Sequence, residues 1–200
     1  MSRLVQALSL TAAAAIFISA MPPARAQDAA KDVAAKAQVC TACHGAQGVP
    51  IDKTIPVIWG QQAGYLYLQL RDFKSGARKN PLMAPVAQSL SRDDMLALAE
   101  FFSKKPWPQL GQPAAPADVA TEAERTNGSI GCTGCHQGNY QGAGTQPRLA
   151  GQRREYLEGQ MLAFRDGSRG NNPGMSDLMK AATKAQIAVM AQYLAGQLVR

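Results

Sequence analysis

The sequence predicts an all-α protein that consists of two tandem copies of one small helical unit. Three observations support this fold class. A long stretch of the 200-residue chain repeats itself at an offset of 91 or 92 residues. Apolar residues recur at the i, i+4 spacing of one helix face, and the strict apolar–polar alternation of a strand is nearly absent. Self-similarity at a fixed period indicates a duplicated structural unit.

The repeat is clearest at a Cys-x-x-Cys-His motif, which occurs at 40–44 and again at 132–136. Further matching pairs are Pro56 and Pro147, Gln61 and Gln152, Tyr65 and Tyr156, Phe73 and Phe164, Arg78 and Arg169, and Met83 and Met175. The spacing from His44 to Met83 and from His136 to Met175 is 39 residues in both copies. We therefore expect equivalent residues to occupy equivalent places in the two halves.

Residues 1–26 are predicted to be a cleaved signal peptide. Arg3 precedes an apolar run at about 8–20, and the A-x-A sequence at 24–26 is a cleavage site. A retained membrane anchor is the alternative, but the apolar run is short, and no stretch of 18 or more purely apolar residues occurs. Cleavage after Ala26 implies export to the periplasm, an oxidising compartment in which paired free thiols do not normally persist.

A proline-rich segment divides the rest of the chain. Residues 106–116 contain four prolines, which excludes a helix interior and indicates an extended connector. The first domain is then 27–105 and the second is 117–200. Trp107, in the connector, is expected to pack between the two domains.

The first helices of each domain are predicted from composition and periodicity. Ala-rich stretches at 28–39 and 117–130 lead into the two cysteine motifs. An amphipathic helix follows each motif, and Gly76 and Gly167 are natural ends for these two helices. Their apolar stripes are formed by Tyr65, Leu66, Leu70 and Phe73 in the first half and by Tyr156, Leu157, Met161 and Phe164 in the second.

The last helix of each domain is predicted to begin at a capping box. Ser91 is followed three residues later by Asp94, and Thr183 is followed three residues later by Gln186. Each domain would thus hold three or four helices in about 80 residues, a size at which a core made only of side chains is marginal. Only 6% of the residues are aromatic, so we expect another group to fill part of each core.

The four cysteines and two histidines narrow the chemistry. A thioredoxin-like pair would need a βαβ pattern, a structural zinc site would need four ligands in each half, and a simple disulfide would leave the adjacent histidine unexplained. Cys-x-x-Cys-His is the attachment signature of c-type haem. We therefore predict two haem c groups, held by thioethers to Cys40 and Cys43 and to Cys132 and Cys135, with His44 and His136 as proximal iron ligands.

The sixth iron ligand follows by elimination, because both histidines are already assigned. Met83 and Met175 follow Asn-Pro loops at equivalent positions ahead of the last helices, and a loop methionine is free to reach the iron. Met179 is a rival to Met175, and a lysine or an open position is the remaining alternative. Methionine ligation raises the reduction potential of the haem. With histidine on one side of the iron and methionine on the other, both axial positions are filled, which favours electron transfer over catalysis.

These residues resemble the dihaem cytochrome c4 family over nearly all of the chain after residue 26. The resemblance rests on the two Cys-x-x-Cys-His motifs, on the Pro-x-x-x-Gly-Gln stretches that precede Tyr-Leu at 56–66 and 147–157, and on the Phe-x-x-Gly-x-Arg runs that follow. The methionine-bearing loop ahead of each last helix completes it.

The resemblance implies two tandem cytochrome c-like domains whose haems face each other across the domain interface. It also implies that the carbonyl groups of Pro56 and Pro147 accept hydrogen bonds from the proximal imidazoles. The implied function is that of a periplasmic or membrane-surface electron carrier, not an enzyme, that passes electrons from a respiratory donor to a terminal haem–copper oxidase.

Charge and counting limit the other functions. Loss of Arg3 and Arg25 with the signal peptide lowers the formal net charge from +7 to +5, which suits docking to acidic partners or to anionic lipid at a membrane surface, and equally suits ordinary solubility. No basic run resembles a nucleic-acid-binding stripe. A fixed haem subunit of a dehydrogenase complex, beside a flavoprotein for example, is the alternative function. A dihaem peroxidase is disfavoured because no histidine is spare.

Overall fold

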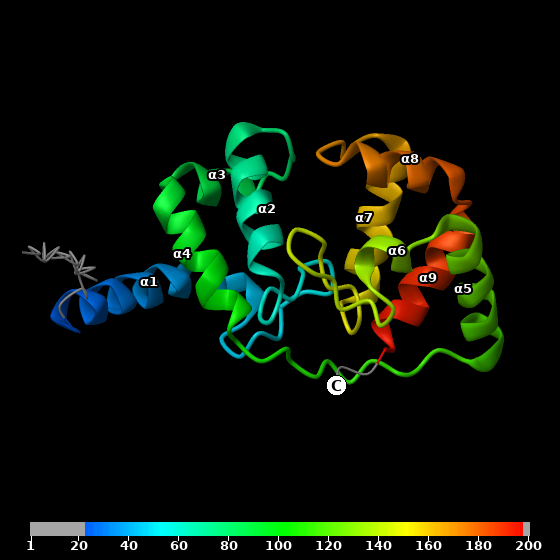
Figure 1. The fold of residues 1–200 in the computed structure, drawn as a ribbon, viewed down its shortest axis with the longest axis horizontal. Coiled ribbons are helices and arrows are strands. Elements are labelled where there is room, and N and C mark those ends of the chain that lie inside the picture. The colour runs from blue at the N-terminus through cyan, green and yellow to red at the C-terminus, as the bar shows by residue number, and fades with distance from the viewer. Residues whose placement is uncertain (1–22, 198–200) are drawn as a thin grey trace, which may run out of the picture.

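The computed structural model describes residues 23–197, with side chains from Asp32 onward, and this part of the chain is helical without a β-sheet (Figure 1). The first four helices are α1 (Pro23–His44), α2 (Ala63–Ser75), α3 (Met83–Gln88) and α4 (Arg92–Ser103). The remaining five are α5 (Ala117–Ile130), α6 (Thr133–His136), α7 (Arg154–Asp166), α8 (Pro173–Ala181) and α9 (Lys184–Ala195). The predicted all-α class is confirmed. The predicted signal peptide falls almost wholly on residues 1–22, which lie outside the described residues.

The helices form two groups that repeat the same packing. In the first group α4 packs on α1 and α2, and α3 packs on α2. In the second group α9 packs on α5 and α7, and α8 packs on α7. Figure 1 shows the two groups side by side, joined along one edge by an extended segment between α4 and α5. The duplication in sequence is therefore a duplication of structure.

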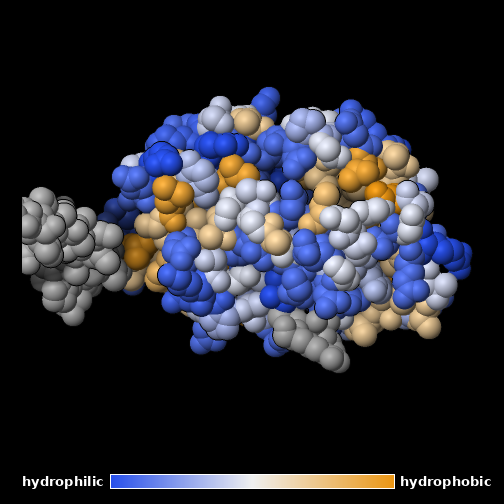
Figure 2. Space-filling view, viewed as in Figure 1, coloured by the Kyte–Doolittle hydropathy of each residue, from blue (hydrophilic) through white to orange (hydrophobic). Residues whose placement is uncertain are grey.

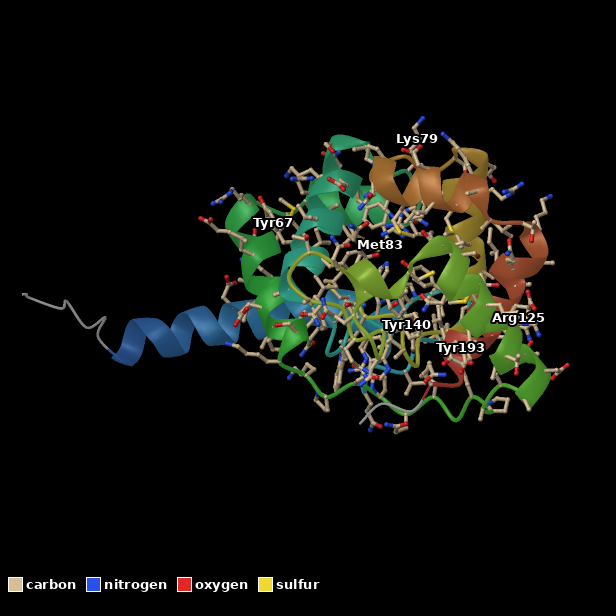
Figure 3. The ribbon with its side chains drawn as sticks, turned by 45° about the vertical axis from the view of Figure 1, so that its right-hand side comes forward. Tyr67, Lys79, Met83, Arg125, Tyr140 and Tyr193 are labelled. Atoms are coloured by element: carbon tan, nitrogen blue, oxygen red, sulfur yellow. The ribbon has the colours of Figure 1, made fainter. Side chains whose placement is uncertain are left out.

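The two groups bury equivalent apolar residues. Leu66, Leu98, Ala99 and Phe102 form the core of the first group with Ala37. Leu157, Met190, Ala191 and Leu194 occupy the corresponding positions in the core of the second group. Tyr140 and Tyr193 add an edge-to-face pair at 6.1 Å between ring centroids in the second group (Figure 3). On the outside, Figure 2 shows hydrophilic residues over most of one face, with apolar residues in separate patches.

The predicted helix ends are present. Ser91 and Thr183 each cap their helix, and the capping box with Asp94 or Gln186 is complete in both halves. Gly76 and Gly167 end α2 and α7 with φ of 78° and 82°, a left-handed conformation that glycine adopts at little cost.

The two cysteine motifs differ in backbone, although their sequences match. In the first half the motif forms the last turns of the continuous helix α1. In the second half α5 ends at Ile130, and Gly131 takes φ of 81° before the short helix α6. The residue equivalent to Gly131 is Val39, whose β-branched side chain disfavours that conformation. Glycine at this position therefore favours the break in the second half, and valine favours the continuous helix in the first.

The connector side chain Trp107 is buried, as predicted. Its exposed fraction is 8%, and the guanidinium of Arg148 from the second half stacks over its ring at 4.4 Å. On the other side, the backbone of Trp107 lies against Gly60 of the first half. Trp107 therefore contacts both halves. No helix in the described range 23–197 has the length and apolarity needed to cross a membrane.

Candidate haem sites

The predicted site residues of both halves line one continuous cavity of about 530 Å³. Its walls include all six residues of the cysteine motifs that were predicted to hold a cofactor: Cys40, Cys43, His44, Cys132, Cys135 and His136. Most of its other lining is apolar, and it comes from helices α2, α4, α7 and α9 and from the loops that follow the two cysteine motifs. Residues far apart in sequence are therefore brought to one internal space.

The four cysteines present free thiols to this cavity. Cys43 and Cys135 are exposed, while Cys40 and Cys132 are half-buried, and burial raises the pKa of these two thiols. The two cysteines of each motif are three residues apart on one helical turn, so both face the same side. This arrangement suits two covalent bonds to one flat group.

The two histidines are buried at 7% and 4% exposure. His44 Nδ1 lies 2.8 Å from the carbonyl oxygen of Pro56, and His136 Nδ1 lies 2.9 Å from that of Pro147. A carbonyl can only accept, so Nδ1 carries the proton in each ring, and the predicted hydrogen bonds to the two proline carbonyls are present. Burial lowers the pKa of both imidazoles, against an opposing contribution from the proline carbonyls.

Each ring therefore has the tautomer that leaves Nε2 with a free lone pair. His136 Nε2 is buried and has no hydrogen-bond partner among the described residues. A buried nitrogen without a partner is costly unless it binds something. A neutral imidazole with Nδ1 bonded to a carbonyl is the usual state of a metal-ligating histidine.

The predicted methionine ligands, Met83 and Met175, also line the cavity. Met83 is labelled in Figure 3. Both lie in the first turn of a helix, α3 or α8, and the expectation that they sit in loops is wrong. The reason is an asparagine side chain ahead of each helix: Asn80 Oδ1, before α3, accepts from the backbone N–H of Met83 at 2.9 Å, and Asn172 Oδ1, at the N-cap of α8, accepts from that of Met175 at 3.1 Å.

The alternatives for the sixth ligand are narrowed by the cavity lining. Met179 lines the cavity too, but only 4% of it is exposed and it packs in a core cluster with Phe164 and Ile187. No lysine lines the cavity in the part of the chain that the structure describes. The two equivalent methionines are the pair that the duplicated fold places alike.

Four polar side chains in the cavity lining, Gln69, Arg78, Gln160 and Arg169, form a hydrogen-bonded wall that was missed as a site from the sequence. Arg78 donates to Gln69 and Gln160 at 2.7 Å each, and Arg169 donates to the same two glutamine oxygens at 2.9 and 2.7 Å. Both arginines are 7% exposed, and neither forms an ion pair with a carboxylate among the described residues. The matching Gly-x-Arg runs were the signal for these residues.

The residues present fit one c-type haem in each half. Paired thiols reach one face of the cavity, a neutral imidazole points a free nitrogen into it, and the apolar walls suit a porphyrin. Two buried guanidinium groups without carboxylate partners suit the carboxylates of haem propionates.

Comparison with known proteins agrees with this geometry. The family model described as Cytochrome c matches residues 120–197. Cytochrome c4 of Azotobacter vinelandii is 34% identical over 191 residues, covering 84% of this chain and 90% of that protein. The thiosulfate dehydrogenase electron acceptor of Stutzerimonas stutzeri is 35% identical over 170 residues, covering 80% of this chain and 79% of that protein.

The fold agrees as well. The crystal structure of reduced recombinant cytochrome c4 from Pseudomonas stutzeri superposes with a TM-score of 0.75 at 29% identity, covering 84% of this chain and 98% of that one. Motif, cavity, fold and relatives point to the same conclusion. The chain belongs to the cytochrome c4 family of electron-transfer haem proteins.

Proposed function

We propose that this protein is a periplasmic dihaem electron carrier, not an enzyme. One haem is held by Cys40 and Cys43, with His44 and Met83 on its iron. The other is held by Cys132 and Cys135, with His136 and Met175 on its iron. The observation that carries the proposal is one continuous cavity lined by both cysteine motifs. In each half the histidine of the motif is hydrogen-bonded through Nδ1 to a proline carbonyl.

Haem c supplies reversible one-electron chemistry between the ferric and ferrous states of its iron. The protein residues determine how that chemistry is used. The proline carbonyls orient the imidazoles, the thiols fix the position of the ring, and the methionine thioethers occupy the position that a small substrate would need. The buried arginines Arg78 and Arg169 would hold the propionates between the two halves.

The proposed route runs from a respiratory donor to a terminal haem–copper oxidase, with peripheral association at a membrane surface. A second candidate is an electron acceptor for a dehydrogenase. It is favoured by the similarity to proteins named as electron acceptors of thiosulfate dehydrogenase. In both cases the protein carries electrons without transforming a substrate of its own.

The proposal is tested on protein purified from the periplasm of a host that attaches haem c. Mass spectrometry should show two covalent haems and an N-terminus at Gln27. A spectroscopic redox titration should show two low-spin waves at positive potential. A single haem, an N-terminus at Met1 or a high-spin component would each contradict a part of the proposal.

The two routes are separated by rapid-mixing kinetics. The oxidised protein is mixed with thiosulfate dehydrogenase and thiosulfate, and the reduced protein is mixed with a haem–copper oxidase. Fast reduction in the first experiment together with slow oxidation in the second favours the dehydrogenase route. Fast oxidation by the oxidase, with no reduction by the dehydrogenase, favours the respiratory route.

A further inference from the structure

One peptide group connects the predicted ligand His44 to the opposite half of the molecule. The carbonyl of the Pro56–Val57 peptide accepts from His44 Nδ1 at 2.8 Å. The N–H of the same peptide group donates to Oε1 of Gln152 at 2.8 Å, although Gln152 is 95 residues away and in the second half. A continuous hydrogen-bond chain therefore runs from the imidazole through one amide to a glutamine of the other domain.

An equivalent hydrogen-bond chain connects His136 of the second half to a glutamine of the first half. The carbonyl of the Pro147–Arg148 peptide accepts from His136 Nδ1 at 2.9 Å, and its N–H donates to Oε1 of Gln61 at 2.7 Å. Each glutamine also donates its Nε2 to the carbonyl of the following residue in the opposite half: Gln61 donates to Arg148 at 2.9 Å, and Gln152 donates to Val57 at 3.0 Å. The two connections are thus crossed and equivalent.

Both glutamine side chains are held firmly. Gln61 and Gln152 are only 3% and 2% exposed. Each Oε1 accepts a second hydrogen bond from the next backbone N–H, that of Gln62 at 2.9 Å or Arg153 at 3.0 Å. Two N–H donors at each Oε1 settle which end of the amide is the oxygen.

The glycine that precedes each glutamine is hydrogen-bonded to the last helix of the same half. The N–H of Gly60 donates to Phe102 and that of Gly151 donates to Leu194, both at 2.9 Å. Each glutamine thus links the last helix of its own domain to the histidine of the other domain.

The acceptor at Nδ1 determines how strongly an imidazole donates electrons to a metal. When the N–H of an amide is itself hydrogen-bonded, its carbonyl becomes a stronger acceptor, because hydrogen bonds in a chain polarise one another. A stronger acceptor gives the imidazole more anionic character, which favours ferric over ferrous iron and lowers the reduction potential.

We propose that Gln61 and Gln152 are crossed positioning residues: each sets the electron-donating strength of the proximal histidine in the opposite domain, and with it the potential of that haem. This inference rests on the proposed function, in which His44 and His136 bind iron. It makes both potentials depend on the docking of the two domains, because a shift of the interface alters both hydrogen-bond chains together.

The test compares holoprotein variants Gln152→Met and Gln61→Met, which keep similar side-chain volume and remove the amide. Gln152→Met should raise the reduction potential of the first haem by up to about 59 mV. For a one-electron couple this is about a tenfold change in the equilibrium constant for reduction. Gln61→Met should do the same to the second haem. The Nδ1–H proton resonance of the affected histidine, assigned in the ferrous protein by contacts within its own domain, should shift with the potential.

Gln62→Met is the matched control. Gln62 also bridges the halves, donating to the carbonyls of Gln141 and Gly142 at 3.0 and 3.2 Å, but its side chain makes no hydrogen bond to the peptide that accepts from His136. This variant should leave both potentials and both ring resonances unchanged. If Gln152→Met does not assemble, Gln152→Asn, whose shorter amide withdraws from Val57, is expected to raise the same potential.

A shift confined to the haem of the mutated domain, or an equal shift of both haems that Gln62→Met reproduces, would overturn the crossed assignment. Unchanged potentials in both glutamine variants would overturn it too. These outcomes are distinct from failure of the proposed function, which would show in the wild-type protein as missing haem or as spectra without histidine ligation.

Discussion

Arg78 and Arg169 donate hydrogen bonds to the same atom, Oε1 of Gln160, and both donor–acceptor distances are 2.7 Å. Two cations from different domains, each only 7% exposed, converge on one neutral oxygen, which is a costly arrangement unless negative charge lies nearby. Each also stacks on the phenylalanine of its own domain, Phe73 at 4.6 Å or Phe164 at 4.3 Å, which fixes its position. Haem propionates would supply the missing negative charge.

Replacing one of these arginines should therefore lower the reduction potentials. In Arg169→Gln a propionate would lose its counter-charge, and the uncompensated anion favours ferric iron. We expect a spectroscopic redox titration to show potentials lower by at most about 59 mV. This is about a tenfold decrease in the equilibrium constant for reduction of a haem. Arg92→Gln, at a side chain that is 72% exposed, is the control and should change nothing. Potentials that stay the same in Arg169→Gln would argue against propionates at this wall.

Removal of one cysteine pair should remove one haem. The double variant Cys132→Ala, Cys135→Ala is expected to keep only the covalent haem of the first half. The double variant Cys40→Ala, Cys43→Ala is expected to keep only that of the second half. Mass spectrometry of the exported protein measures the count directly. Retention of two covalent haems in either double variant would refute the assignment of the thiols.

Loss of the predicted methionine ligand should open an iron site. Met175→Ala is expected to convert one haem to a high-spin or water-bound form and to lower its potential, because methionine ligation raises it. Met83→Ala should act on the other haem. Met179→Leu keeps the packing of a buried side chain at similar volume and is expected to preserve both spectra. The reverse pattern, with Met179 essential and Met175 dispensable, would reassign the second ligand.

The capping residues should contribute measurably to stability. Ser91→Ala and Thr183→Ala each remove a side chain that accepts from a backbone N–H in the first turn, at 3.1 Å in both cases. Each should lower the free energy of unfolding by about 1 kcal/mol in denaturant titration. Ser103→Ala, at the other end of α4, should stay within about 0.5 kcal/mol of wild type. Equal effects at Ser91 and Ser103 would contradict the cap.

Acid should weaken the same cap. Hydrogen bonds from Lys36 and then Ser91 hold the pKa of Asp94 well below its usual range. The stability that Asp94 contributes is therefore complete above the pKa of an unfolded aspartate, about 3.9, and is lost as pH falls through the lower folded value. The difference in unfolding free energy between wild type and Asp94→Asn should be largest near neutral pH and shrink in acid.

Asp93→Asn is the matched control for the acid experiment. Asp93 is 94% exposed and makes only a 4.0 Å contact with Arg92. The difference in unfolding free energy between wild type and Asp93→Asn should stay small across the same pH range. A difference for Asp94→Asn that does not change with pH would show that its carboxylate charge is not responsible.

Much of the molecule could be predicted because the information is local or repeated. The i, i+4 stripes predicted α2 and α7, and the spacing from Ser91 to Asp94 and from Thr183 to Gln186 predicted where α4 and α9 begin. The adjacency of the cysteines and histidine in each motif is covalent, so the sequence alone brings them together. Comparison of the halves predicts the two methionine positions but not their helical setting, because the sequence does not show that Asn80 and Asn172 accept hydrogen bonds from the first turns of α3 and α8.

The crossed partners could not be found that way. The repeat showed that Gln61 and Gln152 are equivalent and that Arg78 and Arg169 are equivalent, yet nothing in the sequence tells which half each side chain will reach. By itself the sequence determined most of the helices and the duplication, and it predicted the residues that would hold two haems. Only the tertiary structure decided that Gln152 bonds Val57 and that both arginines meet at Gln160. A hydrogen bond between residues some 80 to 95 positions apart depends on how two packed domains dock, and no local spacing encodes that orientation.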